Sequence, residues 1–294
     1  MESVEASFLG SIKTFLELIR VRNAALSFVG VYLGALLTAA TTSHPTIDTA
    51  VFYAALSAAL IMGAGNVLND YYDHEIDRIN RPKRPIPSGR ITRPDALMLA
   101  IAMFLIGLGL AKSISTLCLV IVVGNTIILV LYGLYGKTLL GISNFAVAYL
   151  VSSLFLYGAA AAESASPVPE ISRLTLIITL VVASFFSTLS REIIKDVEDR
   201  EGDMKKYSQT IPIHYGVKWA KRIAETSTLT AVIVGFAPLF IAPQTFNTTA
   251  YLPFTLLAAA VFAAAHTMHE TLTQRMLVLG QAISMLAFYA GALL

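Results

Sequence analysis

Charge is scarce in this sequence of 294 residues, and so are cysteine and histidine. Only 14% of the residues are charged and 56% are hydrophobic, whereas soluble domains carry about 25% charged residues. This composition argues against a soluble globular domain and is typical of a polytopic α-helical membrane protein. The single cysteine, Cys118, excludes an internal disulfide and a cysteine-rich metal site.

Nine apolar stretches approach the length of about 20 residues that a helix needs to cross a bilayer. We therefore expect an all-α fold, a helical bundle of about nine transmembrane helices in one domain from residue 1 to residue 294. The boundary between the third and fourth stretches, near Lys112 and Ser113, is poorly defined. The predicted spans cover about residues 21–40, 49–72, 95–112, 114–134, 143–162, 171–195, 220–242, 250–268 and 276–294.

The basic residues lie almost entirely on one side of these spans. With the N-terminus inside, every lysine and arginine except Lys112 and Arg173 falls on the cytoplasmic side. Because cytoplasmic segments carry an excess of Lys and Arg, this asymmetry supports an odd number of spans in the cell membrane. The N-terminus and the long charged loops after the second and sixth spans are then cytoplasmic.

Two acidic motifs of identical spacing end the second and the sixth span. On a helix, offsets of three and seven residues fall within roughly a 60° arc, so each motif is expected to project three carboxylates from one face. Asn66 and Glu192 extend those faces by one turn. Carboxylates at the ends of apolar segments are costly without cations, which points to metal. The motifs are Asp70, Asp73 and Asp77, and then Asp196, Asp199 and Asp203.

The loops that follow the two motifs are also alike. Each contains an Ile-Pro pair about nine residues after the last aspartate, at Ile86-Pro87 and at Ile211-Pro212, followed by a turn and another span. Together with the two motifs, this repeat predicts a duplicated unit. The two related halves would cover about residues 21–140 and 143–294.

Carboxylate clusters without histidine or cysteine favour Mg²⁺ over zinc. Magnesium usually takes few protein carboxylates and keeps positions for water and substrate phosphates. A diphosphate between two such clusters would carry a hydrocarbon tail into the apolar spans, so the predicted substrate is an isoprenyl diphosphate. Nearby basic residues can neutralise the remaining phosphate charge; they are Lys83, Arg84, Arg90, Lys137, Lys205 and Lys206.

The segment Asn69–Gly89, together with Lys195–Asp203, resembles the UbiA superfamily of intramembrane prenyltransferases. The resemblance extends over nearly the whole chain, including the count of nine helices. It implies a bundle around a central cavity, capped by two cytoplasmic loops, and Mg²⁺-dependent transfer of a prenyl group from its diphosphate to an acceptor. We expect membrane lipid as surroundings and no nucleic-acid partner, and the oligomeric state stays open.

The same resemblance implies roles for individual residues. The six motif aspartates would act in catalysis and bind metal together with Asn66 and Asn69. The acceptor would be bound by Arg20, Arg22 and Asn23 at the start of the first span. Contacts to the donor diphosphate are implied for Arg81, Lys83, Arg84, Tyr132, Lys137, Asn144, Lys195 and Lys205.

Among the branches of this family, the sequence from Asn69 to Arg90 is most similar to that of archaeal enzymes of ether-lipid biosynthesis. That branch implies geranylgeranyl diphosphate as donor and geranylgeranylglyceryl phosphate as a lipid phosphate acceptor. Prenylation of an aromatic acid in quinone biosynthesis is the alternative within the family. A transporter built from duplicated halves is the alternative outside it, although its acidic residues would lie near mid-span. The pattern Gly30-x-x-x-Gly34 predicts helix packing.

Overall fold

The computed structural model describes residues 2–39, 48–135, 140–163, 171–205, 209–241 and 246–293. These residues fold into helices joined by turns and short loops, and no strand occurs in the ranges described. The helices are α1 Glu2–Leu18, α2 Val21–Ala39, α3 Thr49–Tyr72, α4 His74–Asn80, α5 Arg93–Ile114, α6 Thr116–Tyr135, α7 Ile142–Glu163, α8 Ile171–Glu198, α9 Arg200–Lys205, α10 Ile211–His214, α11 Val217–Gly235, α12 Pro238–Ile241, α13 Thr248–Ala265 and α14 Glu270–Leu293.

Within these ranges, nine helices are long and apolar enough to cross a membrane. Large apolar side chains such as Leu105, Val120 and Ile233 are more than half exposed on their outer faces. Exposed apolar surface on this scale marks contact with lipid. The prediction of nine spans is confirmed, and the chain is an integral membrane protein.

Several span ends differ from the sequence prediction by a few residues, and two of them have a clear local cause. The ninth span begins at Glu270 rather than near residue 276, because a polar first turn at the membrane surface is helical without being apolar. The third span continues to Ile114, and the break falls at Ser115, whose backbone is extended with φ −163° and ψ 163°. Apolar composition locates the spans well but places their ends only within a few residues.

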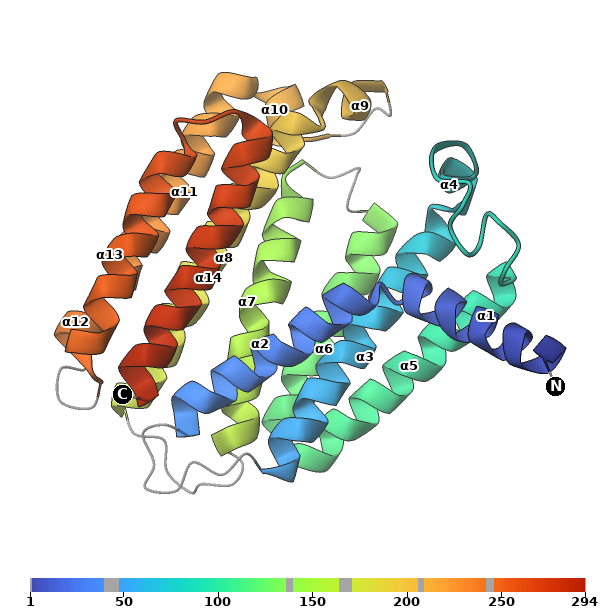
Figure 1. Ribbon diagram of the computed structural model, residues 1–294, viewed down its shortest axis with the longest axis horizontal. Coiled ribbons are helices and arrows are strands. Elements are labelled where there is room, and N and C mark those ends of the chain that lie inside the picture. Colours follow the sequence, from blue (N-terminus) through green and yellow to red (C-terminus); the bar gives the residue numbers. More distant parts are fainter. Residues whose placement is uncertain are drawn as a thin grey trace.

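The two motif-bearing helices end on the same side of the bundle. Figure 1 shows α4, α9 and α10 together at that end, whereas α12 and the C-terminus lie at the opposite end. We call it the motif end, defined by Asp70 on α3 and Asp196 on α8. Helices α2 and α7 pack against each other in the middle, with α3, α5 and α6 on one side and α8, α11, α13 and α14 on the other (Figure 1).

Glycine lets α2 and α7 approach until their backbones touch. A Cβ atom on Gly34 would stand 2.1 Å from the carbonyl oxygen of Phe155, and one on Gly158 would stand 1.9 Å from the carbonyl oxygen of Val31. Gly30 meets the side chain of Leu154 in the same contact. Small residues permit this packing in membranes, where no hydrophobic effect draws helices together. The packing role predicted for Gly30 and Gly34 is therefore confirmed.

The order long helix, motif, short helix, long helix occurs twice along the chain. It runs through α3, α4 and α5 in the first half, and through α8, α9, α10 and α11 in the second. Helix α14 has no counterpart in this repeat and packs against α13 and α8. The order is consistent with a duplicated unit, which stays a prediction.

Substitution of Gly158 by alanine should destabilise the protein, because the new methyl group meets backbone atoms of α2 that cannot rotate away. We expect a loss of about 1–3 kcal/mol in the free energy of unfolding. Thermal unfolding of the detergent-solubilised protein measures the change. Gly109→Ala is the matched control, because nothing lies within 4 Å of a Cβ atom there. Equal melting temperatures for the two variants would contradict the close contact.

Candidate active site

Each aspartate motif is interrupted at its middle residue. Helix α3 ends at Tyr72 and α4 begins at His74, while Asp73 between them has φ −81° and ψ 4°. Likewise α8 ends at Glu198 and α9 begins at Arg200, with Asp199 between them. The expectation that each motif occupies one continuous helix is wrong. The interruption is one residue wide in both copies, and aspartate is a poor helix former.

Backbone hydrogen bonds keep the two sides of each interruption together. The amide nitrogen of Asp73 donates to the carbonyl oxygen of Asn69 at 2.9 Å, and that of Asp77 donates to Asp73 at 2.8 Å. In the second motif, Asp199 bonds to Lys195 at 2.9 Å and Asp203 to Asp199 at 3.0 Å in the same way. These hydrogen bonds keep the three carboxylates of each motif close together, although the middle aspartate lies at a helix end.

Two arginines hold the buried carboxylates of the first motif. Asp70 is 3% exposed, and its Oδ1 accepts hydrogen bonds from Arg20 Nη2 at 2.8 Å and from Arg84 Nη1 at 3.0 Å. The same Arg84 nitrogen donates to Oδ2 of the buried Asp77 at 2.5 Å. A buried charge without a partner costs several kcal/mol. Arg84 therefore folds the loop after α4 back over the end of α3.

Arg20 reaches Asp70 from a strained turn between α1 and α2. Its φ is 50°, in the left-handed region that residues with a side chain rarely adopt. Asn66 secures this turn, because its Nδ2 donates to the carbonyl oxygen of Ile19 at 3.0 Å. Backbone strain persists only where surrounding contacts enforce it, and it clusters at functional sites. Asn66 thus positions Arg20, and its role as a metal ligand stays a prediction.

The loop after α4 is also held against α1, by an ion pair that the sequence does not indicate. Arg90 Nη2 lies 2.6 Å from Glu17 Oε2 and donates to the carbonyl oxygen of Lys83 at 2.7 Å. The hydrogen bond from Arg90 lowers the pKa of Glu17, so the pair stays ionised at neutral pH. Arg90 was expected to neutralise phosphate, but these contacts give it a structural role in the loop.

The second motif is held by different partners. Asn144 Nδ2 donates to Asp196 Oδ2 at 2.8 Å, which brings the start of α7 to the end of α8. One turn earlier on α8, the buried Glu192 pairs with Arg191 at 2.6 Å and with Lys195 at 3.1 Å. Glu192 lies on α8 one turn before Asp196, as its spacing in the sequence predicts. Its charge is balanced by neighbours on its own helix.

Two open clefts adjoin the first motif at the junction of α1, α2 and the loop after α4. One of about 510 Å³ includes Asp70, and its neighbour of about 730 Å³ includes Asn23. Their charged lining is predominantly basic, which suits an anionic group. The predicted acceptor and diphosphate residues thus share one surface. The basic side chains that line the clefts are Lys13, Arg20, Arg22, Arg81, Lys83 and Arg84.

Tyr132 on α6 lies near charged residues of both motifs. Its hydroxyl is within electrostatic range of Lys195, Glu192 and Asp196 at the second motif and of Arg20 at the first. Asn69 lies beside the same helix, 3.6 Å from the Cβ position of Gly133. The structure therefore brings Tyr132, Asn144 and Lys195 to the second motif, and Arg81, Lys83 and Arg84 to the first. Lys137, Lys206 and the Lys205 side chain lie outside the described residues.

The side chains of the two motifs suit a hard divalent cation, because they offer oxygen ligands and include no cysteine. Among the residues that the structure describes, no group of three or more Asp, Glu, His or Cys side chains converges closely enough to hold a metal. Arg20 and Arg84 take the place of a cation at Asp70 and Asp77. Binding of a metal by these two carboxylates would require the arginines to give way.

These features together define a polytopic helical membrane protein whose two equivalent helix ends carry carboxylates beside arginine and lysine. The chain belongs to the UbiA prenyltransferase family, whose model matches residues 27–289. It is a membrane prenyltransferase.

Relatives and solved structures match along almost the whole chain. The digeranylgeranylglyceryl phosphate synthase of Methanopyrus kandleri is 36% identical over 293 residues, which cover 96% of this chain and 100% of that protein. A structure of a digeranylgeranylglyceryl phosphate synthase has a TM-score of 0.82 at 32% identity and covers 96% of this chain and 98% of its own. A UbiA homologue from Archaeoglobus fulgidus bound to GPP and Mg²⁺ shares the fold, with a TM-score of 0.68 at 19% identity and 95% and 99% coverage.

Replacing Arg84 by alanine should destabilise the motif end, because Asp77 loses its arginine partner and Asp70 loses one of two. We expect the free energy of unfolding to fall by about 1–3 kcal/mol. Denaturation in detergent with a metal chelator present measures it. Arg78→Ala is the control, because Arg78 is exposed and lies 3.7 Å from Glu75, a pair worth about 0–1 kcal/mol. An equal loss of unfolding free energy in both variants would contradict the stabilising contacts of Arg84 with Asp70 and Asp77.

Proposed function

We propose that this protein transfers the geranylgeranyl group of geranylgeranyl diphosphate to geranylgeranylglyceryl phosphate, with Mg²⁺ as cofactor. The observation that carries the proposal is the position of both carboxylate motifs at one end of an apolar bundle, with basic clefts beside the first motif. The full-length similarity to digeranylgeranylglyceryl phosphate synthases supports the choice of substrates. The asymmetry of Lys and Arg supports a cytoplasmic motif end in the cell membrane.

In this proposal the carboxylates at the two helix ends hold the donor's diphosphate through a metal, once Arg20 and Arg84 give way at Asp70 and Asp77. When bound there, Mg²⁺ supplies positive charge that stabilises the departing diphosphate. Asp73 and Asp199 stand at the two interruptions, and Asn144 orients Asp196 by its hydrogen bond. Lys195 adds charge beside Asp196 at the point where negative charge develops.

Water has to be kept from the allylic carbon, because positive charge develops there when the C–O bond breaks. Below Asp196, the side chains of Ile193 and Leu189 are almost fully buried among apolar neighbours. Beside the first motif, Val67 and Ala64 are fully buried in a separate apolar cluster. The apolar packing directly under both motifs excludes water from the reacting end of the chain.

The acceptor's phosphate suits the basic clefts beside the first motif. Arg22 and Arg81 line the larger cleft, and Lys83 lines the smaller one. A phosphate bound by them would lie next to Asp70, so the acceptor's hydroxyl could approach the donor from the α1 side. An aromatic acid carries a carboxylate instead of a phosphate and fewer acceptor oxygens, which makes it the second candidate.

Purified protein in detergent should transfer the prenyl group to the lipid phosphate in a reaction that needs Mg²⁺. The assay combines labelled geranylgeranyl diphosphate with either geranylgeranylglyceryl phosphate or an aromatic acid, with and without a chelator, and detects the prenylated product. Transfer to the aromatic acid alone would show that the acceptor is a quinone precursor and not the lipid phosphate. If no Mg²⁺-dependent transfer to either acceptor is detected, the proposed function is wrong.

Asp73→Asn and Asp199→Asn should each lower turnover by about a hundredfold or more, because each removes a charged oxygen ligand at the diphosphate. Both variants should keep the wild-type melting temperature, since each residue lies at a helix interruption outside the apolar core. Glu75→Gln is the matched control, because Glu75 is an exposed carboxylate in the same segment. Near-normal turnover in either aspartate variant would contradict paired metal sites.

A further inference from the structure

Helix α1 leaves the bundle at the motif end and is not one of the nine spans. Figure 1 shows it leading away from the bundle, across the direction in which the spans run. Its last turn is fixed in the core, because Leu18 is fully buried in a cluster with Val67 of α3 and Ala96 of α5. The rest of α1 therefore lies beside the bundle at the level of the first motif, where Arg20 meets Asp70.

A second contact fixes the rotation of α1 about its own axis. Glu17 Oε2 lies 2.6 Å from Arg90 Nη2 in the loop after α4, and Glu17 directly precedes the buried Leu18. One polar and one apolar side chain thus hold α1 on two different sides. The remaining faces of α1 cannot turn inward without breaking the ion pair or exposing Leu18.

Three large side chains form an apolar stripe on the outside of α1. Ile12, Phe15 and Leu16 are each more than a third exposed, and their spacing places them within an arc of about 100°. Glu17 follows Ile12 by five residues and therefore lies about 140° away around the helix. The side of α1 that meets the charged loop is polar and the opposite side is apolar. This is the arrangement of a helix that lies in a membrane interface.

The apolar stripe continues into the lipid-contacting surface of the bundle. Directly after the turn at Arg20, Val21 of α2 is nearly half exposed, and Leu26 further along is more than half exposed. Ile12, Leu16 and Val21 line the same cleft, so they belong to one continuous surface. Because α2 spans the membrane, the exposed apolar side chains at its start contact lipid. The same lipid therefore reaches the stripe on α1.

That cleft combines the apolar edge with positive charge. It is the larger of the two basic clefts, and Arg22 and Arg81 line it opposite the α1 residues Ile12 and Leu16. Lys13 on α1 adds a further basic side chain to the lining. A lipid with a phosphate headgroup has the complementary form, an anionic group next to an apolar chain. Basic side chains near a membrane surface attract such headgroups.

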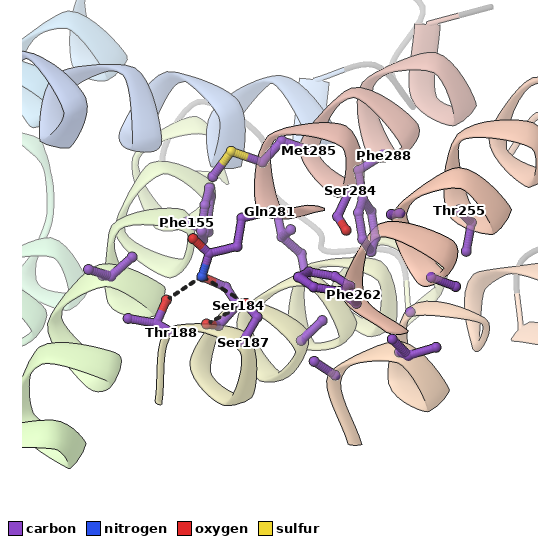
Figure 2. A pocket seen from close by; sticks show the side chains of 18 of the residues that line it. Phe155, Ser184, Ser187, Thr188, Thr255, Phe262, Gln281, Ser284, Met285 and Phe288 are labelled. Carbon is purple, nitrogen blue, oxygen red and sulfur yellow. Dashed lines mark hydrogen bonds between the residues drawn. The ribbon is translucent and has the colours of Figure 1, made fainter. Parts of the chain in front are cut away.

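The cavity in the second half of the bundle has a different chemistry. Figure 2 shows Gln281 bonded across it, and its Nε2 donates to Ser187 Oγ at 3.2 Å and to Thr188 Oγ1 at 3.3 Å. None of the described side chains that line this cavity is charged. A phosphate headgroup would lose its hydration there without gaining a cation. Recognition of the headgroup therefore falls to the cleft beside α1.

We propose that α1 lies in the headgroup layer of the leaflet at the motif end, with Ile12, Phe15 and Leu16 in contact with lipid, and that phosphate-bearing lipids of that leaflet enter the larger basic cleft directly from the membrane. The position of α1 follows from its own faces. Use of the cleft by the acceptor rests on the function proposed above. An acceptor on this route reaches Asp70 without crossing water.

Tryptophan fluorescence tests the position of α1, because the chain has a single tryptophan, Trp219. In a Trp219→Phe background, Phe15→Trp places the fluorophore on the apolar stripe. Gly10→Trp places it on the opposite side of α1, where nothing lies within 4 Å of a Cβ atom. In phosphatidylcholine–phosphatidylglycerol vesicles, lipid with brominated chains should quench Phe15→Trp about threefold more than Gly10→Trp. Leu286→Trp, on the exposed face of α14, gives the value for full lipid contact.

Acrylamide dissolved in water should show the reverse order and quench Gly10→Trp more than Phe15→Trp. Equal quenching of both variants by acrylamide, with little quenching by brominated lipid, would overturn the position of α1. That result is also the one expected if the stripe bound a soluble protein instead of lipid. Each variant replaces an exposed residue, so its melting temperature should stay close to that of the wild type.

A second experiment tests whether phosphate-bearing lipids enter the cleft. Leu16→Trp in the Trp219→Phe background places the fluorophore in the cleft lining. Brominated phosphatidic acid, whose headgroup is a phosphate, should quench it about twofold more than the same fraction of brominated phosphatidylcholine. Arg22→Gln should reduce this difference, whereas Lys112→Gln, at the far end of α5, should leave it unchanged.

Equal quenching by the two brominated lipids, or a difference that Arg22→Gln does not reduce, would overturn the entry of phosphate-bearing lipids through this cleft. Both experiments use neither the prenyl donor nor Mg²⁺. Failure of prenyl transfer in the assay above would therefore disprove the proposed function and leave the position of α1 and the lipid preference of the cleft to be decided by quenching.

Discussion

Carboxylates buried at the end of apolar helices are the constraint on which the rest of this structure depends. Asp70 lies almost out of contact with solvent, so its charge needs partners that α3 itself does not supply. Arg20 comes from the turn before α2 and Arg84 from the loop after α4. One buried charge thereby fixes three segments, and it holds Arg20 in a left-handed conformation that it would otherwise rarely adopt.

The two copies of the aspartate motif lie in different surroundings. The first motif is clamped by arginines beside open basic clefts, above helices whose glycine gaps are filled by neighbouring side chains. The second is tied to α7 by Asn144, above apolar side chains that are almost fully buried. A transfer between two lipids needs such a difference, because the donor's chain and the acceptor's headgroup have to reach one reacting centre from separate places.

Close packing of α2 on α7 holds these two halves in register. Backbone contact at Gly34 and Gly158 leaves no freedom for the helices to slide apart. Since α2 begins next to Arg20 and α7 begins next to Asn144, the same contact sets how far the two motifs stand from each other. Tyr132 on α6 lies within electrostatic range of charged residues at both motifs.

The sequence by itself determined the nine spans, the two aspartate motifs and the family, because apolar length and residue spacing are properties of a continuous stretch of chain. It also indicated the glycine contact of α2. It could not determine which arginine meets Asp70, the break at Asp73 and Asp199, or the pairing of Glu17 with Arg90. The clefts beside the first motif were equally hidden. Apart from the two breaks, which arise within the motifs themselves, each of these depends on side chains from segments far apart in sequence, so only tertiary packing decided them.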